Sequence, residues 1–553
     1  MKRALASLSF LALFSIALFG QSTLAPAAFD VEDIHTSPPA QFPFYQEGVL
    51  RGDRYAVHQA TLVNLIATAY GVDSDKVQGG PSWLDSDRFD VIAKAPPKTS
   101  PETIKLMLQS MLAERFKLVV HTDTKLMPVF VLMEGKGKAK LKESSDSESA
   151  ANTGCIPQPP PPNSTPGPTS YIVVSCHHVS MEDFAKIIHQ FAGGYLPNPV
   201  VDNTGLKGFW DFDIKWTGRG GLAQAGSDGI SIFDAVDKQL GLKLDPQKLP
   251  LPVIVVDSAN EKPTDNPAGI AKVLPAAPPA EFEVAVIKPS GPGETLNFAI
   301  NGGQINMQLV TLKMLITVAW DLDPAASNMI VGAPKWLDSD HFDVVAKTTT
   351  DAPPPVPGQQ NALPADIDDL RHMLRALLEE RFNLKTHMED RPVNAYTLIA
   401  VNPKLKKADP SNRTGCKEGP GADGKDPRIA NPVLARLVTC LNITMPQFAE
   451  QLRLQASGYL FQFPPIEDAT GLDGAYDITI SFSTAGAAQG FGGGGRGGDA
   501  PPPGAAAGTA PDPNGAVSIF DAVSKQLGLK LEMRKRPMPV LVIDHVDEKP
   551  TDN

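Results

Sequence analysis

The hydrophobic and polar positions of this chain alternate between the spacing of strands and the spacing of helices. Ile104, Met107, Leu108, Met111 and Leu112 lie three and four residues apart, which is typical of one face of a helix. Helices with such an apolar stripe bury it against a neighbouring sheet, so the pattern indicates α+β structure. The first half of the chain has further helical patterns near residues 62–69, 184–191 and 232–240, and strand patterns near residues 29–34, 89–93, 129–133, 209–216 and 253–257.

The same order of patterns occurs twice. Residues 231–266 and 518–553 align without a gap and are identical at 25 of 36 positions. Shorter blocks recur in the same order, among them Trp-Leu-Asp-Ser-Asp from Trp83 and from Trp336. The repeated unit is far longer than a solenoid repeat, which indicates a pair of homologous domains.

The repeat defines the expected division of the chain. We predict a signal peptide at residues 1–27, a first copy at 28–266, a Pro/Ala linker at 267–280 and a second copy at 281–553. A disordered insert rich in Gly, Pro and Ala is expected at about residues 485–516, because such composition buries too little apolar surface to order itself. Each copy is expected to be an α+β domain with amphipathic helices packed on a mixed or antiparallel sheet.

The N-terminus resembles a secretory signal. Lys2 and Arg3 precede an apolar run at residues 4–19, and Ala25-Pro26-Ala27 fits an A-x-A cleavage site. The alternative is an uncleaved anchor, although the run is short for a helix that spans a membrane. We therefore expect an exported protein, periplasmic or extracellular, whose mature chain has no transmembrane segment.

The charge of the chain bounds its partners. With 50 basic and 62 acidic residues the formal net charge is −12, so nucleic acid is not expected as a partner, because phosphate binding needs a basic surface. The lysine run at residues 136–142 is interpreted as a solvated surface.

Four cysteines fit an oxidising compartment. Four cysteines allow three pairings, and the duplication favours one bond within each copy. The predicted disulfides are Cys155–Cys176 and Cys416–Cys440.

Two sets of aspartates are the strongest candidates for chemistry. In each copy they form a D-x-D-x-x-D pattern that approaches a set of calcium ligands. The alternative is a turn in which Asp and Ser side chains cap local amides. The aspartates are Asp85, Asp87, Asp90, Asp338, Asp340 and Asp343.

Histidines offer weaker candidates. His121 and His387 occupy equivalent positions in the two copies and are expected to be structural. A metal site at His177 and His178 would be confined to the first copy. The chain contains no H-E-x-x-H, G-x-S-x-G, P-loop or C-x-x-C motif, so catalytic residues remain unassigned and no cofactor is expected.

The repeated blocks resemble the soil-associated protein family, which is built on a bacterial domain of unknown function. The resemblance rests on G-G-P-S-W-L-D-S-D-R-F-D from Gly79, L-A-E-R-F-K-L from Leu112, D-x-T-G-L-x-G from Asp202 and Asp468, and the S-I-F-D-A-V and K-P-T-x-N blocks of both copies. It implies an exported protein with no established catalytic residue. The same domain occurs as the exported tail of some membrane metallopeptidases of the β-lactam-sensor type.

These observations favour a non-enzymatic binding or scaffold module of the cell envelope or extracellular space, with a protein or polymer as partner. One alternative is an envelope or polysaccharide hydrolase that uses the aspartate carboxylates. Another is an ectodomain that senses a small ligand.

Overall fold

The computed structural model describes residues 27–38, 45–144, 153–158, 171–275, 281–291, 296–301, 303–322, 329–348, 367–421, 424–431, 433–485 and 515–551. Apart from Ala27, the predicted signal peptide lies outside these residues, and so does nearly all of the predicted insert at 485–516. The described chain is α+β, as the hydrophobic pattern predicts, and each copy contains three sheets of four strands in the same order.

The N-terminal sheet of the first copy is antiparallel, in the order β1-β5-β3-β2. Helices α1 and α2 pack on it, and Leu65, Leu108 and Phe116 are buried in the core between them. Helix α1 begins at Thr61, whose hydroxyl accepts the amide of Asn64 while the Asn64 side chain accepts the Thr61 amide. The elements are β1 (Val31–Thr36), β2 (Gln46–Arg51), β3 (Arg54–Thr61), α1 (Leu62–Tyr70), β5 (Arg88–Lys94) and α2 (Pro101–Arg115).

The C-terminal sheet of the first copy, in the order β7-β11-β9-β8, encloses a second core with Phe184 and Trp216. The helix of the Ser-Ile-Phe-Asp block begins at Ser231, whose hydroxyl accepts the amide of Asp234 at 3.1 Å. The elements are β7 (Lys142–Glu143), β8 (Gly154–Gln158), β9 (Tyr171–Val179), α3 (Met181–Phe191), β11 (Trp210–Thr217), α4 (Arg219–Ala225), α5 (Ile232–Ala235) and its π-helical continuation Val236–Leu240.

A long two-stranded ribbon joins the two cores. It consists of β6 (Val119–Glu134) and β12 (Leu242–Ser258), which pair antiparallel over nearly their whole lengths. The short strands β10 (Val200–Asp202) and β4 (Val77–Gly79) pair in parallel with its ends, at residues 130–132 and 254–256. The sheet is therefore mixed, in the order β10-β6-β12-β4.

The ribbon corrects the two short strands predicted near residues 129–133 and 253–257. The apolar pattern is interrupted by exposed prolines in the middle of the ribbon, which is why sequence reasoning ended the strands early. All of these prolines lie on one face of the ribbon. At these positions a backbone N–H would point away from the partner strand, so a proline there costs the ladder no hydrogen bond. They are Pro128, Pro246, Pro250 and Pro252, and in the second copy Pro392, Pro537 and Pro539.

The second copy repeats this plan. Its N-terminal sheet has the order β13-β17-β15-β14, its ribbon sheet β16-β24-β18-β22 and its C-terminal sheet β19-β23-β21-β20. The strands are β13 (Val284–Pro289), β14 (Asn297–Asn301), β15 (Gln304–Thr311), β16 (Ile330–Val331), β17 (His341–Lys347), β18 (Lys385–Ala400), β19 (Lys406–Lys407), β20 (Gly415–Glu418), β21 (Arg436–Thr444), β22 (Glu467–Asp468), β23 (Ala475–Phe482) and β24 (Leu529–His545). The helices are α6 (Leu312–Ala319), α7 (Trp336–Ser339), α8 (Ile367–Phe382), α9 (Met445–Gln455), α10 (Ser457–Leu460) and α12 (Ile519–Leu527).

The glycine that follows the helix of the repeated Ser-Ile-Phe-Asp block has a structural reason in both copies. Gly528 ends α12 with a left-handed φ of 68°, and a Cβ there would lie 1.7 Å from the carbonyl oxygen of Asn402. Its counterpart Gly241 has a φ of 70°, and a Cβ there would lie 2.6 Å from the carbonyl oxygen of Lys138. The Leu-Gly pair that follows the helix in both copies is therefore required by the turn into the ribbon.

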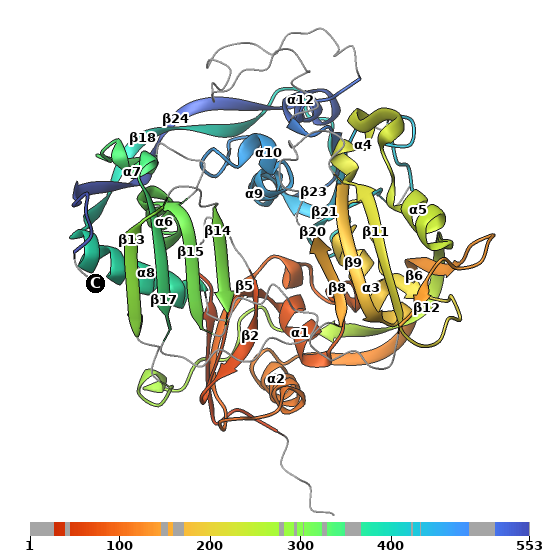
Figure 1. Ribbon diagram of the computed structural model, residues 1–553, viewed down its shortest axis with the longest axis horizontal. Helices are drawn as coiled ribbons and strands as arrows, with labels where there is room; N and C mark the ends of the chain where they lie inside the picture. The colour runs from red at the N-terminus through yellow and green to blue at the C-terminus, as the bar shows by residue number, and fades with distance from the viewer. Residues whose placement is uncertain are drawn as a thin grey trace, which may run out of the picture.

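The two copies lie side by side (Figure 1). The N-terminal parts meet where Arg51 of β2 forms an ion pair of 3.4 Å with Asp369 of α8. At the C-terminal parts, α4 of the first copy lies beside β21 and β23 of the second, and a Cβ on Gly220 would be 2.9 Å from Thr484. Part of the predicted linker is also docked, because Arg54 donates to the carbonyl oxygen of Pro275 at 2.9 Å.

Candidate functional site

The aspartates predicted as an acidic cluster have separate partners. Asp85 ends the short 3-10 helix η2 (Ser82–Asp85) and binds a residue of the second copy, whereas Asp87 accepts the Ser86 hydroxyl at 2.9 Å. Asp90 lies within β5 and is buried, with 7% of its surface exposed. Within the described ranges, no group of three or more His, Cys, Asp or Glu side chains could hold a metal ion. The three aspartates therefore do not converge on one site: Asp87 has a local partner, whereas Asp85 and Asp90 bind groups distant in the sequence.

The aspartates of the second copy are also held separately. Asp338 forms an ion pair of 3.0 Å with Lys313, and Asp340 accepts the Ser339 hydroxyl at 3.0 Å. Asp343 is the counterpart of Asp90 and is 3% exposed. The D-x-D-x-x-D pattern thus provides one buried carboxylate and two surface carboxylates in each copy.

The buried aspartate supports an irregular step in the neighbouring strand. Asp90 Oδ1 accepts the Ser37 hydroxyl at 2.5 Å and the Gln59 amide at 2.9 Å, where β3 contains a bulge and Gln59 has a φ of 55°. Asp343 does the same with Ser290 at 2.7 Å and the amide of Leu309 at 3.2 Å. A left-handed φ is uncommon for these residue types, so the carboxylate stabilises a strained backbone position in both copies.

The basic side chains around this carboxylate differ between the copies. His58 Nδ1 lies 3.5 Å and His35 Nε2 lies 3.7 Å from Asp90 Oδ2, whereas Lys288 Nζ lies 3.5 Å from Asp343 Oδ2. Burial raises the pKa of Asp90, but hydrogen bonds from His58, Ser37 and the Gln59 amide outweigh it, so the pKa lies below its usual value. A carboxyl group held ionised in this way is suited to supporting structure rather than to donating a proton.

Replacing Asp90 by asparagine is expected to destabilise the N-terminal sheet of the first copy by about 1–2 kcal/mol at neutral pH, because the charge that accepts these hydrogen bonds is lost. A lowered folded-state pKa adds stability above the unfolded pKa of about 4, and this stability disappears as the pH falls through the folded value. The difference between variant and wild type should therefore shrink in acid. Hydrogen exchange of the β3 and β5 amides measures the effect, with Asp87→Asn as the control that leaves them unchanged. A pH-independent difference would contradict the assignment.

Asp85 forms the clearest contact between the copies. The guanidinium of Arg413 donates to Asp85 Oδ2 at 2.6 Å and to Oδ1 at 2.7 Å, and also donates to the Val77 carbonyl oxygen. The Thr414 amide donates to the Ser82 carbonyl oxygen at 3.1 Å. Two parallel hydrogen bonds give an arginine–carboxylate pair a defined geometry. Sequence reasoning identified Asp85 but missed Arg413, because no local pattern marks a partner 328 residues away.

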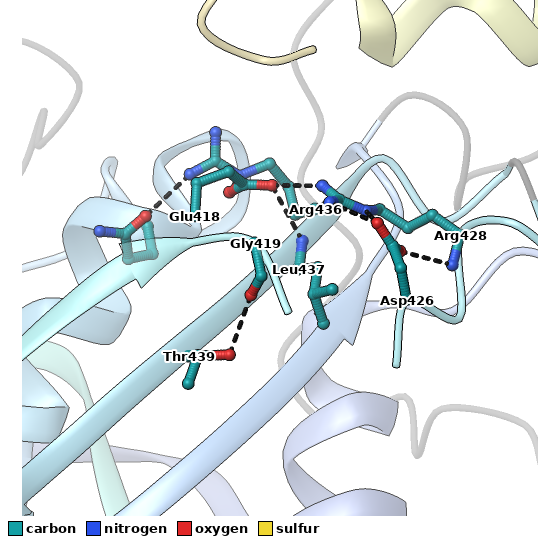
Figure 2. Close-up of polar contacts among 8 residues, drawn as sticks. Glu418, Gly419, Asp426, Arg428, Arg436, Leu437 and Thr439 are labelled. Atoms are coloured by element: carbon teal, nitrogen blue, oxygen red, sulfur yellow. Dashed lines mark hydrogen bonds and ion pairs between the residues drawn. The ribbon is translucent and has the colours of Figure 1, made fainter. Parts of the chain in front are cut away.

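Glu418, the last residue of β20, belongs to a polar network that surrounds the buried side chain of Arg428 (Figure 2). Arg428, with a side chain that is 3% exposed, donates to Glu418 at 2.6 Å and to Asp426 at 2.8 Å. Glu418 also accepts the Leu437 amide at 3.1 Å and lies 3.3 Å from Arg436. Burial raises the pKa of Asp426, but the hydrogen bonds from Arg428 outweigh it and lower the pKa overall. The network therefore holds the chain between β20 and β21 in place.

The first copy contributes an arginine to the same region. The Arg219 guanidinium lies 5.5 Å from the centre of the Tyr195 ring. Burial, followed by the like charge of Arg428, lowers the pKa of Arg219. Burial also raises the pKa of Tyr195 to about 12, and its hydroxyl donates to the Thr217 carbonyl oxygen at 2.8 Å. The polar groups of both copies thus influence one another across the junction.

Both predicted disulfides are present, Cys155–Cys176 and Cys416–Cys440. Each joins residues directly opposite one another on an edge strand and its neighbour, β8 to β9 and β20 to β21. Each therefore fixes the register of an edge strand.

The structure adds an acidic partner to each of the paired histidines. His121 Nδ1 lies 2.9 Å from Asp257 Oδ2, and His387 Nδ1 lies 2.8 Å from Asp544 Oδ2. About half of each side chain is exposed, with 52% for His121 and 50% for His387. The pairs join opposite strands of each ribbon and were missed because their members are 136 and 157 residues apart.

The candidate metal site at His177 and His178 is not formed. His178 stacks on Phe209 with ring centres 4.1 Å apart, and its Nδ1 lies 3.2 Å from the Ser144 hydroxyl. His178 has a φ of 48° at a bulge that Asn442 repeats in the second copy with a φ of 47°. The residue is therefore used in the strand bulge and in packing.

A family model described as "Protein of unknown function (DUF3738)" matches residues 63–259 and 313–546, which is more than half of the chain. The two matched regions fall in the two copies. No curated protein and no solved structure matches the chain.

Proposed function

We propose that the chain, which belongs to this family of proteins of unknown function and contains two copies of its domain, is a non-enzymatic, two-site binding or scaffold protein. Its location would be the cell envelope or the extracellular space. The observation that carries the proposal is the contact between the copies. The bidentate Arg413–Asp85 pair and the Thr414–Ser82 hydrogen bond give the copies a defined relative position. Two equivalent surfaces at a fixed spacing suit a repetitive target, such as a polymer or an oligomeric protein.

Fixed spacing changes the expected binding behaviour. When the second site is already held near its target, its binding is intramolecular, and the apparent affinity of the pair exceeds that of one copy by about 10²–10⁴. The gain is largest when the spacing of the sites matches the spacing of the target. We infer a partner with regularly repeated features.

One further feature supports location outside the cytoplasm. The chain contains two disulfides, which persist in oxidising compartments. Together with the signal-like N-terminus, the disulfides fit an exported protein. In the described part of the chain, no helix has the length and apolarity needed to cross a membrane.

The test compares residues 28–553 with the first copy alone, residues 28–266, as bait for an envelope protein extract and a cell-wall fraction. Each copy encloses its own two cores, so the shorter chain is expected to fold, and its circular dichroism spectrum checks this. Enrichment of one target by the two-copy chain, with retention at least tenfold longer than on one copy, is expected. Equal retention would refute two-site binding, and turnover of a polymer in the same fraction would favour the hydrolase instead.

A further inference from the structure

Strand β20 carries a large part of the contact between the copies. Immediately before it, Arg413 and Thr414 bind Asp85 and Ser82 of the first copy. Immediately after it, a Cβ on Gly419 would lie 3.8 Å from Pro197 of the first copy. A strand of four residues at the edge of its sheet thus spans two points of contact with the other copy.

One covalent bond anchors this strand. Cys416, three residues after Arg413, is bonded to Cys440 of β21, and Cys440 is 1% exposed. The anchor lies on the C-terminal core, which contains Phe448 and Ile478. The position of Arg413 at Asp85 therefore depends on a strand that is tied to its own domain by its edge pairing and by this disulfide.

The two disulfides differ in accessibility. Cys155, Cys176 and Cys440 are buried, at 7%, 0% and 1% exposure, whereas Cys416 is only partly buried. Attack on a disulfide requires access to one of its sulfur atoms. Cys416 is therefore the most exposed of the four cysteines, and it belongs to the disulfide at the junction.

We propose that the Cys416–Cys440 disulfide is a redox-sensitive link, and that its reduction by a dithiol releases the contact of Arg413 and Thr414 with Asp85 and Ser82 of the first copy without unfolding either core. In this reaction the thiolate of the dithiol attacks Cys416 Sγ, a mixed disulfide forms and Cys440 leaves as a thiolate. The second thiol of the reductant then displaces Cys416, so two electrons pass from the dithiol, which becomes a disulfide. The proposal concerns this link alone and does not depend on what the protein binds.

The experiment uses the full chain with one disulfide at a time. In a Cys155→Ser, Cys176→Ser variant only the junction bond remains, and dithiothreitol serves as the dithiol. Reduction should increase the amide exchange of residues 413–419 about tenfold. It should also increase exchange of residues 82–87 in the first copy, which contain no cysteine and contact Arg413 and Thr414. Reoxidation should restore both rates.

The matched control is Cys416→Ser, Cys440→Ser, which retains only the disulfide of the first copy. Its exchange at residues 82–87 should already be high and should not respond to the reductant. Reduction of the junction disulfide is verified by alkylation and mass spectrometry. If the amide exchange of residues 82–87 does not change on reduction, the disulfide does not control the contact between the copies and the proposal is wrong. If circular dichroism shows that the single-disulfide variants do not fold, the wild type is reduced stepwise instead. Cys416 and Cys440 should then be alkylated before Cys155 and Cys176. The opposite order would also overturn the proposal.

Discussion

Replacing Arg115 by alanine is expected to lower the free energy of unfolding of the first copy by about 3–5 kcal/mol. The residue is 4% exposed, and its guanidinium donates to the Thr264 hydroxyl at 3.0 Å, to the Thr264 carbonyl oxygen at 2.8 Å and to the Glu32 carbonyl oxygen at 3.1 Å. It also donates to the Asn266 side chain, which bonds the backbone of Ile34 in β1. Truncation would remove the buried donor that joins β1 to residues 264–266 and would leave several partly buried acceptors without it, each at a cost in free energy.

Urea unfolding and hydrogen exchange of β1 and of residues 260–266 measure this loss. Arg115→Lys is the matched control, because it keeps the charge but has no planar fork, and we expect an intermediate loss. A loss below about 1 kcal/mol for the alanine variant would place Arg115 among ordinary surface residues and contradict the prediction. The Glu-Arg-Phe and Lys-Pro-Thr blocks also meet in the second copy, where the Thr551 amide donates to the Arg381 carbonyl oxygen at 2.8 Å.

Replacing Arg428 by alanine is expected to cost about 3 kcal/mol in the second copy and to loosen its junction with the first. Asp426 and Glu418, with side chains 17% and 19% exposed, would lose the cation that pairs with both (Figure 2). Because the pKa of Asp426 is lowered, its contribution is present above the unfolded pKa of about 4 and disappears as the pH falls through the folded value. The effect of the substitution should therefore diminish in acid.

The matched control is Arg534→Ala. Arg534 forms an ion pair of 3.1 Å with Glu532, two residues away as Asp426 is from Arg428, but these side chains are 48% and 37% exposed. An exposed pair contributes about 0–1 kcal/mol, so this variant should unfold almost as the wild type does. Equal losses in the two variants would mean that burial of the Arg428 network is not what stabilises the second copy.

Local patterns predicted the helices and the fold class well. The stripe of Ile104 to Leu112 is buried in α2, and the strand pattern at 209–216 is β11, because a single buried face produces both spacings. The ribbons were predicted too short. Many of their central residues, such as 121–126 of β6, are exposed on both faces, and the ribbons contain prolines. The periodic apolar signal is therefore lost although the two strands remain paired.

The candidate site was less predictable. Asp85 and Asp90 were correctly singled out as a repeated feature, but their sequence spacing of five residues does not bring them to one partner. Arg413, Asp257 and Asp544 lie 328, 136 and 157 residues away from the groups they bind. Such pairs depend on the pairing of distant strands and on the packing of the copies, which hydrophobic periodicity does not encode.

The prolines of the ribbons have a consequence for the protein among its own copies. Between its flanking short strands each ribbon is a ladder of two strands, whose outer N–H and C=O groups face solvent and could accept a strand from another molecule. Pro250, Pro252, Pro537 and Pro539 stand in the pairs whose N–H would point outward, and a proline has no such donor. The later strand of each ribbon thereby lacks two outward donors, which disfavours its pairing with a strand of another molecule while the ribbon still joins the two cores without a break.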